Sequence, residues 1–166
     1  MHNYISFLEK LDAQLEIYHK SYSEHIFCQK GCSYCCEKGD YPLSEIELRY
    51  LMLGYSGLDN KIKLIVQQNI RCIEKSGKCP FLINQCCSIY KFRPIICRVH
   101  GLPYICSNNL VKLPYCVNNG LNFSKVYVNN EFIIEPIKTN LDTFSLLKEI
   151  DCGEIRNLYD WLYLND

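Results

Sequence analysis

Cysteine is the residue type whose number and spacing in this sequence could support chemistry. Twelve of the 166 residues are cysteines. Four of them lie in the segment Cys28-Gln-Lys-Gly-Cys32-Ser-Tyr-Cys35-Cys36, and a second group follows at Cys79, Cys86, Cys87 and Cys97. Thiolate sulfurs bind soft or borderline metals, and four of them satisfy one Zn²⁺ ion or one iron–sulfur cluster. The cysteine pattern therefore predicts a metal centre.

The spacing of the first group suggests how its sulfurs could meet. Tight turns aim neighbouring sulfurs at a common point, and Cys28, Cys32 and Cys35 can converge in this way. Cys36 follows directly, and successive side chains diverge unless the backbone kinks. Cys36 therefore serves a second metal or a neighbouring role, or it is a buried thiol. Neither group alone is a complete site, whereas together they close one or two four-ligand sites, so we expect the two groups to meet.

Charge and hydropathy exclude several classes of function. The 18 Lys and Arg residues balance the 18 Asp and Glu residues, and no basic run indicates a nucleic-acid or anionic membrane surface. No stretch approaches the roughly 20 apolar residues that span a membrane. Charges interrupt the first twelve residues, which disfavours a secretory signal. We therefore predict a cytoplasmic protein, in which clustered thiols bind metals more often than they form structural disulfides.

Hydrophobic periodicity predicts a mainly helical chain with small hairpins. Length predicts one domain over residues 1–166, with its own hydrophobic core. Hairpins are expected around Asn84-Gln85 and Asn129-Asn130. Helices are predicted over about residues 3–24, 45–57, 59–75, 141–150 and 155–164. The expected fold class is mainly α with small β-hairpins, an irregular α+β fold organised around a cysteine-bound metal centre.

The combined motifs resemble one family. These motifs are Cys28…Cys32-x2-Cys35-Cys36, Pro42-Leu-Ser-x-x-Glu47, Cys79-Pro-Phe-Leu82 and Cys87-Ser-Ile-Tyr90-x-x-Arg93-Pro94-x-x-Cys97-Arg98. Together they resemble the YkgJ-like cysteine-cluster family, which is described as a zinc- or iron-chelating domain. The resemblance implies a family-like core over about residues 27–116, with flanking helices at both ends. The ligands that it implies are Cys28, Cys32, Cys35, Cys36, Cys79, Cys87, Cys97 and Cys116.

A second signature overlaps the first group. Cys28-x3-Cys32-x-Tyr34-Cys35 matches the Cys-x3-Cys-x-aromatic-Cys pattern of radical S-adenosylmethionine enzymes. That loop should follow a barrel strand, yet a helical pattern precedes it here, and 166 residues are few for such a barrel. We therefore interpret the three-residue spacing as a variation within the cysteine-cluster family, which more often has two residues there.

Other residues near the cysteines have two interpretations each. Arg93 and Arg98 flank Cys97 and either donate to thiolates or an anionic substrate, or pair with surface acids. His100 fits a structural histidine in a turn better than a ligand. Cys72 is expected to be a buried thiol on a helix. The remaining expectations are that Cys106 and Cys152 are non-ligand thiols and that Trp161 closes the core.

Two classes of function remain from the sequence. The first is a metal-binding protein that chelates iron, as an iron–sulfur cluster, or zinc, with a protein partner possible. The alternative is an enzyme with an iron–sulfur centre, either a small oxidoreductase or a protein methyltransferase like the flagellin lysine N-methylase among the family's relatives. No Gly-rich nucleotide loop and no clear acid–base pair supports catalysis, so no catalytic residue is assigned.

Overall fold

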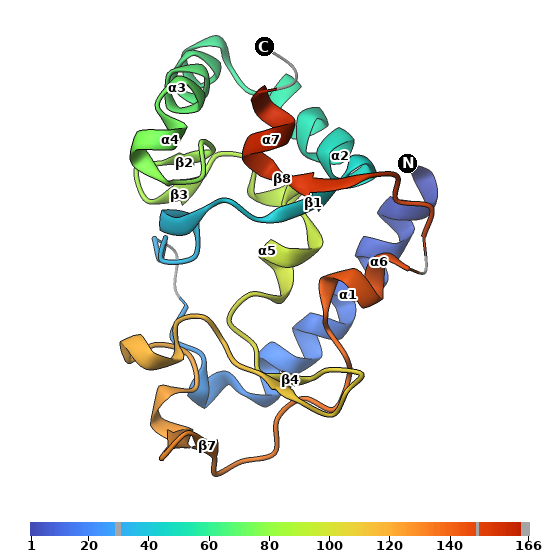
Figure 1. The fold of residues 1–166 in the computed structure, drawn as a ribbon, viewed down its shortest axis with the longest axis vertical. Coiled ribbons are helices and arrows are strands. Elements are labelled where there is room, and N and C mark those ends of the chain that lie inside the picture. The colour runs from blue at the N-terminus through green and yellow to red at the C-terminus, as the bar shows by residue number, and fades with distance from the viewer. Residues whose placement is uncertain (29–30, 149, 164–166) are drawn as a thin grey trace. The chain divides into compact units, whose positions relative to one another are not determined.

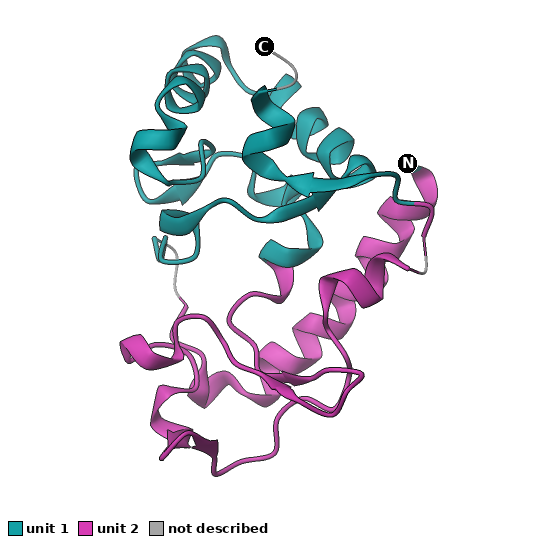
Figure 2. Cartoon of the chain, in the orientation of Figure 1, with its two compact units in different colours: residues 1, 30–97, 152–166 teal, residues 2–29, 98–151 magenta. Residues whose placement is uncertain are grey.

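The computed structural model describes residues 1–28, 31–148 and 150–163. Glu149 and Leu164, which the sequence placed in helices, lie outside the described residues, as do Gln29 and Lys30 of the first cysteine group. The chain forms two compact units (Figure 2): unit 1 is residues 1, 30–97 and 152–166, and unit 2 is residues 2–29 and 98–151. Helices and four antiparallel strand pairs confirm the α+β class. The single domain expected from length stays a prediction.

Unit 1 alternates short helices with two strand pairs (Figure 1). Its 3₁₀ turns lie at Cys36–Lys38 and Tyr90–Phe92. The helix α5, Ile95–Val99, begins in this unit. Its other elements are β1 (Pro42–Ser44), α2 (Glu45–Ser56), α3 (Asn60–Arg71), α4 (Ile73–Ser76), β2 (Leu82–Ile83), β3 (Cys86–Cys87), β8 (Ile155–Asn157) and α7 (Leu158–Tyr163).

Side-chain caps begin two of these helices where the sequence predicted. Ser44 and Glu47 form the capping box at the start of α2. The Asp59 carboxylate accepts a hydrogen bond from the Ile62 amide at 3.0 Å at the start of α3. The helix predicted over residues 59–75 is divided into two at Cys72, which is the C-cap residue of α3 and the N-cap residue of α4. Cys72 is exposed, so the expectation that it is buried is wrong.

The hairpin of β2 and β3 places Cys87 on a regular strand. Leu82 pairs with Cys87 and Ile83 pairs with Cys86. The two turn residues Asn84 and Gln85 have φ angles of 49° and 61°. Two consecutive left-handed residues match the right-handed twist of the flanking strands, which makes a two-residue hairpin possible. The predicted hairpin is confirmed.

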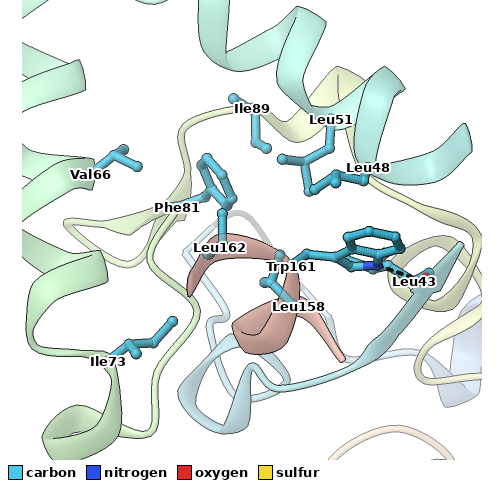
Figure 3. Packing of buried hydrophobic residues seen from close by; sticks show 10 residues of the cluster. All are labelled: Leu43, Leu48, Leu51, Val66, Ile73, Phe81, Ile89, Leu158, Trp161 and Leu162. Atoms are coloured by element: carbon cyan, nitrogen blue, oxygen red, sulfur yellow. Dashed lines mark hydrogen bonds between the residues drawn. The ribbon is translucent and has the colours of Figure 1, made fainter. Parts of the chain in front are cut away.

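The core of unit 1 lies between its helices and the β2–β3 hairpin (Figure 3). The indole Nε1 of Trp161 donates to the Leu43 carbonyl at 2.9 Å and so joins α7 to β1. Trp161 therefore closes the core, as expected. Cys79 and Cys87 pack partly buried against this cluster, so two thiols lie at the edge of the core. The core residues are Leu43, Leu48, Leu51, Val66, Ile73, Phe81, Ile89, Leu158, Trp161 and Leu162.

The end of the chain corrects one prediction. The helix predicted from residue 155 begins only at Leu158, because residues 155–157 form β8, which pairs antiparallel with β1. Backbone bonds extend this pairing on both sides: the Glu45 amide donates to Glu154 at 2.8 Å, and the Leu158 amide donates to Tyr41 at 2.9 Å. These partners lie more than a hundred residues apart, so local periodicity could not reveal them.

Among its described residues, unit 2 contains the first helix, two strand pairs, 3₁₀ turns and a short helix. The helix α1, His2–Ser21, buries Tyr4, Leu8, Leu11 and Leu15, as its periodicity predicted. The hairpin of β6 (Tyr127–Val128) and β7 (Glu131–Phe132) turns at Asn129-Asn130 and is confirmed. The pair of β4 (Tyr104–Ile105) and β5 (Val111–Lys112) was not predicted. The helix predicted over 141–150 is shorter: α6 covers Thr143–Leu147.

No helix among the described residues combines the length and the apolar character needed to cross a membrane.

Candidate metal centre

Unit 1 brings together five of the eight cysteines predicted as ligands. Their sulfurs lie near enough that the charge of one changes the pKa of others. Members of both sequence groups are present, because Cys35 and Cys36 come from the first and the rest from the second. We call this set the five-thiol group: Cys35, Cys36, Cys79, Cys87 and Cys97.

Cys35 and Cys36 form a hydrogen-bonded pair. The Cys36 thiol donates to the Cys35 sulfur, which lowers the pKa of Cys35 to about 7 and raises that of Cys36 far above its ordinary value. The 3₁₀ turn at Cys36–Lys38 supplies the backbone kink that lets adjacent side chains face the same region. The Tyr41 hydroxyl donates to the Cys35 carbonyl at 2.7 Å and holds this turn. Cys35 is therefore the thiol of this pair that ionises first.

Cys79 is held against the first cysteine group by its backbone. Its amide donates to the Cys36 carbonyl at 2.8 Å. Gly39 lies so close that a Cβ there would be 2.3 Å from the Cys79 nitrogen, so only glycine fits. Burial raises the pKa of Cys79 to about 12, while backbone hydrogen bonds from Phe81 and Leu82 act in the opposite direction. The Leu82 amide also donates to the Cys79 carbonyl at 3.0 Å, which closes the Cys-Pro-Phe-Leu turn around this residue.

Cys87 and Cys97 complete the five-thiol group. Burial raises the pKa of Cys87, and the Ile89 amide opposes this by donating to its sulfur. Burial also raises the pKa of Cys97 well above its ordinary value, with further repulsion from Cys79, Cys35 and Cys87. Without a cation Cys79, Cys87 and Cys97 therefore keep their protons at neutral pH. A bound metal ion reverses this balance, because it stabilises deprotonated thiolates.

Arg93 is the cation whose charge acts on this group. Its guanidinium lies 4.0 Å from the centroid of the Tyr90 ring. Its charge lowers the pKa of Cys35, Cys87 and Cys97 relative to the values that burial alone would give. Of the two interpretations of Arg93, the structure favours a role beside the thiols. Arg98 instead pairs with Asp12 within unit 2, with its own side chain 5% exposed.

The donor set fits a thiophilic metal. Amides that donate to sulfur from one to three residues beyond a cysteine are suited to metal thiolates, because they stabilise the charge on sulfur. As the side chains stand, no three or more Cys, His, Asp or Glu residues among those described are arranged to hold an ion. Binding would therefore require the sulfurs of the five-thiol group to draw together.

The other three predicted ligands lie elsewhere. Cys32 is exposed in a segment of unit 1 without regular secondary structure. Cys28 and Cys116 belong to unit 2, where Cys28 is exposed and Cys116 is buried. His100 also belongs to unit 2, with its ring 6.0 Å from that of Tyr115.

The cysteines outside the predicted set differ from Cys87 in their surroundings. Cys86, its neighbour on β3, is exposed, and its charge contributes to raising the pKa of Cys87. Cys106 and Cys152 are partly buried.

Asn122 is a buried hydrogen-bond partner of Cys28 that sequence reasoning missed. It is 1% exposed, and its Oδ1 accepts hydrogen bonds from the backbone amides of Phe27 at 2.8 Å and Cys28 at 3.0 Å. Its Nδ2 donates to the Gly101 carbonyl at 3.1 Å and the Cys28 sulfur at 3.2 Å. Nothing in the local pattern around an isolated asparagine signals such a clamp, since its partners lie far away in sequence.

Comparison with known families identifies the family of the chain. Residues 27–117 match the CxxCxxCC family, described as a putative zinc- or iron-chelating domain. The chain belongs to this family. It is the cysteine-cluster family that the sequence motifs indicated, and the matched residues contain all eight predicted ligands. No curated protein and no solved structure matches the chain.

Proposed function

We propose that the protein chelates iron, as an iron–sulfur cluster bound by thiolates of the five-thiol group, and that zinc is the alternative these donors allow. The observation that carries the proposal is the grouping of five thiols in unit 1, three of which also face donating backbone amides. Four thiolates satisfy either centre. Cys28, Cys32 and Cys116 stay predicted ligands.

The thiol-rich sequence favours the cluster over zinc. A single Zn²⁺ ion uses four ligands, whereas five thiols group here and the triplet of Cys28, Cys32 and Cys35 adds others. A bound cluster would supply one-electron redox chemistry, with a potential set by hydrogen bonds to its sulfurs and by burial. In this chain the amides of Phe81, Leu82 and Ile89 and the charge of Arg93 are the groups that would tune it.

The metal would also stabilise unit 1. Residues 31–41 and 77–94 contain only short turns and the β2–β3 hairpin. Their sulfurs raise one another's pKa, so the metal-free group is electrostatically unfavourable once a thiol ionises. Since a structural metal contributes its binding energy to folding, we expect unit 1 to depend on the ion.

The experiment is anaerobic purification followed by quantification of iron, acid-labile sulfide and zinc, with a visible absorption spectrum. We expect iron and sulfide in comparable amounts and a broad band near ~400 nm that is lost on oxidation. A colourless protein with stoichiometric zinc, even after anaerobic reconstitution with iron and sulfide, would establish the zinc alternative. Protein that binds neither metal would refute chelation.

A further inference from the structure

Glu47 is a buried carboxylate at the start of α2. It is 0% exposed, and both of its oxygens accept hydrogen bonds. Oε2 accepts a hydrogen bond from the Ser44 amide at 2.9 Å, as the capping box requires, and another from the Ser44 hydroxyl at 2.8 Å. Oε1 accepts the Ile95 amide at 2.9 Å.

The local capping role does not explain this second contact. A capping box needs a glutamate that reaches back to its own helix start, and such a residue can remain exposed to solvent. Burying a carboxylate is costly unless it is fully hydrogen-bonded. Here the carboxylate is buried, and its second oxygen binds an amide 48 residues away in sequence. The cost is therefore offset by a contact that joins α2 to another segment.

That segment carries a member of the five-thiol group. Ile95 is the first residue of α5 and precedes Cys97 by two residues. The Cys97 amide donates to the Pro94 carbonyl at 3.1 Å, so the backbone position of Cys97 depends on the position of Pro94 and Ile95. An amide fixed at Ile95 thus fixes the turn from which the Cys97 side chain projects.

Two further contacts from α2 hold the same arm at its start. The Tyr50 hydroxyl donates to the Lys91 carbonyl at 3.2 Å. Gly54 lies against the Phe92 ring, since a Cβ there would be 2.6 Å from a ring carbon. The arm from residue 91 to residue 97 is therefore held along α2, with Glu47 as the contact nearest to Cys97.

We propose that Glu47 is a positioning residue for metal binding, which holds Cys97 in place for the ion through the Ile95 amide. The effect on metal binding rests on the proposed function, but the hydrogen bonds from which the inference is drawn are present in the metal-free protein. A carboxylate is needed because three donors converge on its two oxygens. A glutamine would turn its NH₂ group toward one of these donors and lose that contact.

Glu47→Gln tests the proposal with two matched controls. Glu45→Gln removes a charge from the same helical turn, where the side chain pairs with Arg49 instead. Ser44→Ala removes the hydroxyl of the capping box and destabilises α2, but leaves the contact between Glu47 and Ile95. The readout is the rate of iodoacetamide alkylation at each cysteine of metal-free protein, measured by mass spectrometry.

We expect alkylation of Cys97 to be about tenfold faster in Glu47→Gln than in wild type or either control, since an opening of about 1.4 kcal/mol is a tenfold population change. Alkylation of the exposed Cys72, at the junction of α3 and α4, should be equal in all four proteins. Zinc affinity, from competition with a chromophoric chelator, should fall by about 10- to 100-fold, as for other groups that orient a ligand.

Two results would overturn the inference. One is a Cys97 rate in Glu47→Gln equal to that in Ser44→Ala, and the other is unchanged zinc affinity. If Glu47→Gln does not fold, Glu47→Asp is used instead. It shortens the side chain by one methylene, draws the carboxylate away from the Ile95 amide, and is compared with the same two controls. Because alkylation is measured without metal, wild-type protein that binds no metal would refute chelation but leave the test of Cys97 positioning intact.

Discussion

The cysteines of the two units differ in their surroundings. In unit 1, five thiols from both sequence groups change one another's pKa, and two of them, Cys79 and Cys87, pack against the hydrophobic core. In unit 2, Cys28 is held by the Asn122 side chain, and Cys116 is a buried residue next to a 3₁₀ turn. Ionised thiols that repel one another are stabilised when a cation binds between them. Unit 1 is therefore the unit in which we expect the loss of metal to matter most.

The sharpest test replaces two adjacent cysteines in turn. Cys87→Ser removes a partly buried member of the five-thiol group, and Cys86→Ser removes its exposed neighbour on the same strand. We expect metal content to fall below about a tenth of wild type in Cys87→Ser, because a hydroxyl is a poor substitute for a thiolate ligand. Cys86→Ser should keep full stoichiometry. Equal metal content in the two variants would remove Cys87 from the site.

A change of pH should alter metal affinity strongly. Burial raises the pKa of Cys79 to about 12 and also raises that of Cys97 well above its ordinary value, so both hold protons at neutral pH. Metal binding must displace those protons, and affinity therefore rises with pH. We expect zinc affinity to increase more than about tenfold per pH unit between pH 6 and pH 8. Affinity that does not vary over this range would show that protonated thiols are not the ligands.

Unit 2 can be perturbed without touching the five-thiol group. Asn122→Ala removes the two hydrogen bonds that this buried side chain accepts and the two that it donates, and leaves the amides of Phe27 and Cys28 without their acceptor. We expect the free energy of unfolding to fall by about 2–4 kcal/mol, measured by urea denaturation. Asn118→Ala, at an exposed position, should change it little. Metal stoichiometry of folded protein should be unchanged, and a lost metal would tie Asn122 to the centre.

The smallest expected effect concerns the approach of Gly39 to Cys79. An added methyl group would meet the Cys79 backbone at 2.3–2.5 Å, so the two segments must separate. We expect Gly39→Ala to destabilise metal-free protein by about 1–3 kcal/mol in urea denaturation. Gly57→Ala is the control, because its nearest contact would be 3.6 Å away. Equal stability of the two variants would mean that the segments are not held together there.

Local sequence predicted the elements that local chemistry determines. The capping box at Ser44 and Glu47, the buried face of α1 and the turn at Asn84-Gln85 each depend on residues a few positions apart. The cysteine motifs likewise indicated the family and both groups of thiols.

The features that sequence reasoning missed are long-range. The pairing of β1 with β8, the Asn122 clamp and the contact between Glu47 and Ile95 each join residues from 48 to more than a hundred positions apart. Periodicity carries no information about such pairs. For the same reason the cysteine motifs indicated eight ligands, but could not show to which unit each of them belongs.

The most direct test of the account is alkylation of each cysteine with and without bound metal. Wild-type protein loaded with zinc or reconstituted with iron and sulfide is treated with iodoacetamide, and each site is quantified by mass spectrometry. The account predicts that metal slows labelling of Cys35, Cys79, Cys87 and Cys97 by about tenfold or more, while Cys72 and Cys86 label at unchanged rates. Equal labelling of those four cysteines with and without metal would contradict the claim that unit 1 holds the ion.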